Sequence, residues 1–133
     1  MAGFVLDTGI LLRHLRNRPG FKVLLDHIAH EDDLIIASFT RLEVLQGMRD
    51  HERDRTLALL NSLITHPLDV PTADLVAALI RDQLARRKTI AGPDAVIAAT
   101  ALTSDATLVT MNPRHFPFAS LKVRQVNEKG EVV

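Results

Sequence analysis

The chain has 133 residues, of which 47% are hydrophobic, so it is long enough for one domain with a buried core. Its 16 basic and 16 acidic residues cancel, which excludes a protein that binds nucleic acid through a large positive net charge, although local basic patches remain open. The absence of cysteine excludes disulfides, thiolate metal sites and a thiol nucleophile.

No apolar run approaches the ~18 residues that span a membrane, and the first residues lack the basic start of a signal peptide. We therefore expect a soluble cytoplasmic protein without a membrane segment. No repeat, low-complexity tract or linker divides the sequence, so we expect a single domain over residues 1–133.

The first third of the chain alternates apolar strands with amphipathic helices. Residues 4–6 predict a short buried strand that ends in Asp7, and Thr8 is a candidate N-cap for the helix that follows. Apolar residues at helical spacing predict a second helix over residues 21–30. The β-branched run 34–38 predicts a second strand, which leads into a third helix.

The middle of the chain is mainly helical in pattern. The charged residues 49–55 indicate a solvated connection, and leucines at helical spacing predict a helix over residues 56–65. Residues 68–70, between two prolines, form at most a short strand. Thr72 opens a further helix, whose end lies near the basic residues 86–88.

The last third begins with the most apolar helix of the chain. Pro93 fits the first position of this helix, and residues 95–102 are apolar nearly all round, as in a buried helix. Residues 107–110 predict a short buried strand. Residues 121–126 alternate apolar and polar as an edge strand would, and residues 127–133 indicate a polar tail.

Strands that alternate with helices predict an α/β fold, with a mainly parallel sheet covered by helices on both faces. In such sheets, ligands bind beyond the carboxyl ends of the strands. Asp7 and Asn112 follow predicted strands at this edge, while Glu43 and Asp94 lie early in helices that leave it. We therefore expect these four side chains to converge in one site.

Three carboxylates gathered in one cleft need a cation between them. Two such charges ~4 Å apart repel by about 4 kcal/mol at an effective dielectric constant of ~20. Ligands that are all oxygen, without cysteine or histidine, favour a hard ion such as Mg²⁺ or Mn²⁺ over zinc. Such an ion binds phosphate oxygens and lowers the pKa of an attacking water, so the pattern indicates phosphodiester hydrolysis.

Each of the four residues also has an ordinary structural alternative. Glu43 fits a capping box with Thr40, and Asp94 in a first turn could serve only the helix dipole. Asp7 could accept hydrogen bonds from the turn that follows it. Asn112 precedes a proline, which is a common turn pair.

Basic residues near the predicted site could bind a phosphate. Arg114 and His115 closely follow Asn112, although His115 also fits a loop side chain that bonds the backbone. Other basic residues could flank the cleft as phosphate contacts or could simply be solvated: Arg13, Arg16, Arg18 and the run 86–88.

The chain carries ordered motifs that cover nearly its full length: Val5-Leu-Asp-Thr8, Thr40-Arg-Leu-Glu43 with Gly47, Asp94-Ala-Val-Ile-Ala-Ala99 with Ala101, Leu108-Val-Thr110, Asn112, His115-Phe116 and Leu121-Lys-Val123. Together, these motifs resemble PIN-domain ribonucleases, specifically the VapC toxins of prokaryotic toxin–antitoxin pairs. The ordered set is far more specific than any one motif.

This resemblance implies a three-layer α/β/α sandwich around a mainly parallel sheet, with RNA cleavage that depends on Mg²⁺ or Mn²⁺. It also implies a homodimer and a VapB-type antitoxin that neutralises the toxin. By motif position, Asp7, Glu43 and Asp94 are similar to the family's acidic metal ligands. Asn112 stands where many PIN domains carry a fourth acid, which implies a catalytic contact made through water.

Two other functions remain open from the residues. A Mg²⁺-dependent phosphatase could use Asp7 as a nucleophile, although Gly9 stands where a second aspartate would be expected. A catalytically inert PIN-like module could bind RNA or an antitoxin, although three retained carboxylates speak against it.

Overall fold

The computed structural model describes residues 3–133, so Met1 and Ala2, which the predicted domain 1–133 includes, lie outside the described residues. A five-stranded parallel sheet forms the centre, with strand order β3-β2-β1-β4-β5. The strands are β1 (Phe4–Leu6), β2 (Leu34–Ala37), β3 (Ile64–His66), β4 (Thr107–Thr110) and β5 (Val123–Gln125).

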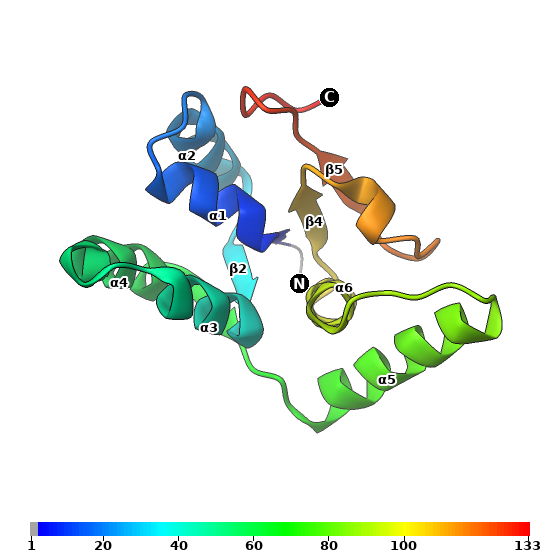
Figure 1. Ribbon diagram of the computed structural model, residues 1–133. Helices are drawn as coiled ribbons and strands as arrows, with labels where there is room; N and C mark the ends of the chain where they lie inside the picture. The colour runs from blue at the N-terminus through cyan, green and yellow to red at the C-terminus, as the bar shows by residue number, and fades with distance from the viewer. Residues whose placement is uncertain (1–2) are drawn as a thin grey trace.

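Six α-helices and two short 3-10 helices connect the strands. They are α1 (Thr8–Leu15), α2 (Phe21–Glu31), α3 (Ser38–Gly47), η1 (Asp50–Glu52), α4 (Arg53–Asn61), α5 (Val70–Ala85), α6 (Gly92–Thr103) and η2 (Pro113–His115). In Figure 1, α1 and α2 lie on one side of the molecule, and α5 and α6 lie on the other. None of the helices in the described part of the chain is long and apolar enough to cross a membrane.

Alternate residues of the strands face two separate cores, as the period of a strand requires. In β1, Leu6 packs in the core that contains Phe21 of α2, whereas Val5 packs in the core that contains Ile97 of α6. These side chains are almost completely buried, and burying each contributes about 1.5–3 kcal/mol. The predicted parallel sheet with helices on both faces is therefore confirmed.

The chain between α4 and α5 differs from its prediction. The helix expected over residues 56–65 ends at Asn61, and Ile64–His66 instead forms the edge strand β3. Residues 68–70 do not form the short strand that the sequence allowed. Asp69 caps α5, because its carboxylate accepts a hydrogen bond of 3.1 Å from the backbone N–H of Thr72, so this helix begins at Val70.

The predicted polar tail over residues 127–133 packs against the body of the protein. Val126 and Val132 form an isolated antiparallel bridge, and Gly130 is buried. A Cβ atom on Gly20 would lie 1.9 Å from the carbonyl oxygen of Lys129, so only glycine allows this approach. Figure 1 shows this C-terminal segment, in red, beside α2.

Candidate functional site

The direction of the strand order changes between the neighbouring strands β1 and β4. These two strands are parallel, so their carboxyl ends lie at the same edge of the sheet. Asp7 follows β1 directly, and its backbone N–H donates to the carbonyl of Val109 at 3.0 Å. Its side chain meets the last residue of β4, because the Thr110 hydroxyl donates to Asp7 Oδ2 at 2.7 Å. Asp7 therefore lies at the switch point where parallel sheets of this kind bind ligands.

Glu43 is held at the same edge by the start of α1. The Thr8 hydroxyl lies 2.9 Å from Glu43 Oε1 and 3.2 Å from the hydroxyl of Thr40. The predicted N-cap role of Thr8 is wrong, since α1 begins at Thr8 itself and Asp7 occupies the N-cap position. The capping box of Thr40 and Glu43 is also excluded, because Thr40 lies inside α3 and is fully buried.

Asp94 lies in the first turn of α6, as predicted. Its side chain is 25% exposed, and its Oδ2 lies 3.7 Å from Nδ1 of His115. The His115 side chain thus faces this carboxylate, and it makes no hydrogen bond to the backbone of residues 3–133, so the loop alternative does not hold. The charges of Asp7 and Glu43 both act on Asp94, so the fold brings the three predicted acids together.

Burial disfavours the charged forms of both aspartates. It raises the pKa of Asp7 above its ordinary value, against the opposing hydrogen bonds from the Thr110 hydroxyl and the Thr8 backbone N–H. Burial also raises the pKa of Asp94; His115 opposes this rise, while the negative charges of Asp7 and Glu43 add to it. For both aspartates, burial therefore outweighs the neighbouring groups that favour the ionised carboxylate.

Asn112 contributes to the site through its backbone. It precedes η2, and its N–H donates to the Thr110 hydroxyl at 3.0 Å. Because that hydroxyl accepts from Asn112, its own hydrogen is directed to Asp7. Asn112 and Arg114 are exposed at this edge. Sequence reasoning paired Thr40 with Glu43 only as a capping box and gave Thr110 no role; the signal available was a hydroxyl residue at the end of a buried strand and another in the first turn of a helix.

The donor set suits a hard cation, since it consists of carboxylate oxygens and, within residues 3–133, none of these three acids pairs with lysine or arginine. Instead, Asp7 contacts Thr110, Glu43 contacts Thr8, and Asp94 contacts His115. Among the described side chains, no three His, Asp or Glu residues lie close enough together to hold a metal ion as they stand. The type of donor, carboxylate oxygen, nevertheless fits Mg²⁺ or Mn²⁺.

Comparison with known proteins gives consistent matches over nearly the whole chain. The PIN domain family model matches residues 4–121. Ribonuclease VapC19 from Mycobacterium tuberculosis is 34% identical over 114 residues, which cover 85% of this chain and 91% of the relative.

Solved structures give the same fold. VapBC2 from Rickettsia felis, bound to a DNA fragment from its promoter, matches with a TM-score of 0.81 at 20% identity, covering 94% of this chain and 99% of that one. A toxin–antitoxin complex from Klebsiella pneumoniae matches with a TM-score of 0.74 at 26% identity, covering 87% and 92% of the two chains.

Proposed function

Because this chain belongs to the PIN-domain family, which its sequence motifs resemble, we propose that it is a metal-dependent endoribonuclease acting at Asp7, Glu43 and Asp94. Its similarity to a relative that is named a ribonuclease supports the proposal. The observation that carries it is that Asp7 and Glu43 lie near enough for their charges to act on Asp94, while none of the three has a lysine or arginine partner in the described part of the chain.

In this proposal, the three carboxylates would hold Mg²⁺ or Mn²⁺, which would supply a Lewis acid for the phosphoryl oxygens and a bound water of lowered pKa. Thr110 orients the Asp7 carboxylate, and Thr8 orients that of Glu43. Asn112 is exposed next to Thr110, where its side-chain amide would hydrogen-bond the water that attacks the RNA phosphodiester. Asp7 and Asp94 are both partly buried, so bulk water screens these contacts less than it would at a fully exposed site.

The direct test replaces one carboxylate at a time in the full chain. We expect Asp7→Asn and Asp94→Asn to lower the rate of RNA cleavage by about a hundredfold or more, since each removes a charged ligand worth several kcal/mol in the transition state. Cleavage is measured on labelled RNA with Mg²⁺, with Mn²⁺ and with chelator. Asp105→Asn is the matched control, because Asp105 is exposed and its partner is Lys122.

Other outcomes separate the competing functions. Full RNA cleavage by both site variants would end the proposal. Release of phosphate from a small phosphoester, without RNA cleavage, would favour the phosphatase. A wild-type protein that neither cleaves RNA nor gains thermal stability with Mg²⁺ or Mn²⁺ would favour the inert module, because a ligand that binds only the native state must stabilise it.

We further propose that the protein is the toxin of a pair and forms a homodimer that a VapB-type antitoxin neutralises. Its similarity to a solved toxin–antitoxin complex at 26% identity supports the proposal. Co-expression with the neighbouring gene should yield a complex, whose stoichiometry light scattering measures. Expression of the active chain alone without growth arrest would contradict the toxin role.

A further inference from the structure

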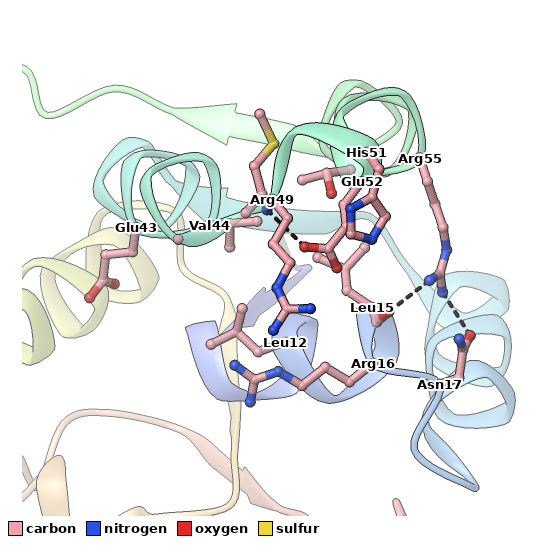
Figure 2. A pocket seen from close by; sticks show the side chains of 13 residues that line it. Leu12, Leu15, Arg16, Asn17, Glu43, Val44, Arg49, His51, Glu52 and Arg55 are labelled. Carbon is pink, nitrogen blue, oxygen red and sulfur yellow. Dashed lines mark hydrogen bonds between the residues drawn. The ribbon is translucent and has the colours of Figure 1, made fainter.

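A pocket of about 770 Å³ lies beside the candidate site and shares Glu43 with it. Its floor is apolar, from Leu12 and Leu15 of α1 and Val44 of α3. Figure 2 shows Glu43 at one end of this pocket, with its carboxylate directed away from the pocket centre, toward the yellow-green ribbon of α6. Glu43 is therefore shared between this pocket and the edge at which we propose that RNA is cut.

Two arginines reach into this pocket from different elements. Arg16 follows the end of α1, and Arg49 lies in the connection between α3 and η1. In Figure 2, both side chains extend toward Leu12, so that their guanidinium groups end over the apolar floor. Two positive charges in one pocket repel each other, and an anion bound between them would offset this repulsion.

Neither guanidinium has a carboxylate partner within residues 3–133. The nearby acid Glu52 accepts the backbone N–H of Arg49 at 2.8 Å instead of its side chain. By contrast, the third arginine of the pocket has a structural role: Arg55 donates to the carbonyl of Leu15 at 2.7 Å and to Asn17 Oδ1 at 2.9 Å. The charges of Arg16 and Arg49 are thus available to a ligand.

We propose that Arg16 and Arg49 together bind a phosphate of the RNA strand adjacent to the scissile phosphodiester. This inference rests on the proposed ribonuclease function. A strand cut at the carboxylates carries another negative charge at the next nucleotide, and the pocket beyond Glu43 offers two planar guanidinium groups that match phosphate oxygens. Because the chain has no net charge, long-range attraction does not bring RNA to the three acids. Local contacts between arginines and phosphates would position the strand there instead.

The test measures RNA binding without cleavage. Arg16→Gln and Arg49→Gln are made in the Asp94→Asn protein, and binding of a short fluorescein-labelled single-stranded RNA is followed by anisotropy at increasing salt. Arg81→Gln is the matched control, because Arg81 is exposed on α5 and does not line the pocket. Thermal melts confirm that each variant folds.

We expect each pocket variant to bind the RNA about five- to tenfold more weakly than the control at low salt, and to reduce the salt slope by about 0.7 for each lost phosphate contact. In the otherwise wild-type enzyme, the same changes should raise KM and leave kcat nearly unchanged, because a phosphate contact binds ground state and transition state alike.

Equal RNA affinity and equal salt slope for the pocket variants and Arg81→Gln would overturn the inference, while cleavage by the wild type would leave the ribonuclease proposal intact. The same result accompanied by loss of antitoxin binding would assign this surface to the protein partner. A wild type that neither binds nor cleaves RNA would remove the proposed function, and this inference with it.

Discussion

Thr110 connects two parts of the candidate site through one hydroxyl group. It accepts from the backbone of Asn112 and donates to Asp7, so it fixes both the turn after β4 and the carboxylate after β1. The hydroxyl is fully buried, and a hydrogen bond to a charged group in such a place contributes more than a neutral one. Its role depends on the β1–β4 register, in which Leu6 pairs with Val109.

Thr110→Val should lower the free energy of unfolding by about 1–3 kcal/mol at neutral pH, because the Asp7 carboxylate loses its donor. The bond opposes the rise in the Asp7 pKa, so valine should raise that pKa further. The stability that the bond supplies belongs to the ionised carboxylate and is lost as pH falls through the folded-state pKa. The difference between wild type and variant should therefore shrink in acid.

Urea unfolding over a pH series, with chelator present, measures this effect. Thr110→Ser is the matched control, since it keeps the hydroxyl and should retain most of the stability. A Thr110→Val protein with the same deficit at acid and neutral pH would show that only packing had been lost.

At the scale of elements, α6 holds Asp94 in place by lying close to the sheet. Four of its alanines, at positions 95, 98, 99 and 101, have no exposed surface. Small side chains let the helix axis approach the strands, which keeps its N-terminal turn near the switch point. The helix has almost no polar face because α5 covers its outer side, with Val76 and Leu79 packed against the same core.

Ala98→Leu should therefore destabilise the protein by about 1–3 kcal/mol, because the added carbons have no space between α6 and the sheet. Ala77→Leu on the exposed side of α5 is the control and should change stability little. Denaturant unfolding measures both. Equal stability of the two variants would mean that α6 can move away from the sheet without cost.

The elements that could be predicted from sequence are those with a strong local pattern. The strands at 4–6 and 107–110 and the apolar helix α6 match their predictions because period and burial agree within each segment; the strand predicted over 34–38 ends one residue earlier, since Ser38 begins α3. β3 was missed because the helical spacing of the leucines continues past Asn61, and because strand pairing with β2 is a tertiary contact that local pattern does not contain.

The same limit applies to the candidate site. The topology argument led to the prediction that Asp7, Glu43 and Asp94 share one edge, and their mutual charges in the folded chain agree with it. Their role as metal ligands stays a prediction. The hydroxyl partners could not be predicted, since Thr8 is 35 residues from Glu43 and Thr110 is 103 residues from Asp7.

At the scale of the whole molecule, the last residues of the chain are held against the start of α2. Gly20 and Gly130 both have positive φ angles, of 90° and 75°, and their backbones touch. This contact adds a fixed point between the C-terminal segment and the helices on one face of the sheet. Its stability depends on the absence of side chains at both positions.

Gly130→Ala should lower the free energy of unfolding by about 2 kcal/mol or more, because a Cβ there would lie 2.7 Å from the carbonyl carbon and oxygen of Gly20 and the backbone would be strained. Gly47→Ala is the control: no atom lies within 4 Å of the added carbon, and α3 should gain about 0.5–1 kcal/mol. Denaturant unfolding compares them. A neutral Gly130→Ala would show that the tail detaches freely.

The central position of β1 has a consequence for synthesis. Asp7 lies 103 residues before its hydroxyl partner Thr110, and its strand pairs with β4, which is made much later. Until β4 has been made and has paired with β1, the sheet edge that carries the three acids is incomplete. The proposed RNA cleavage therefore depends on a pairing between segments that are far apart in the sequence.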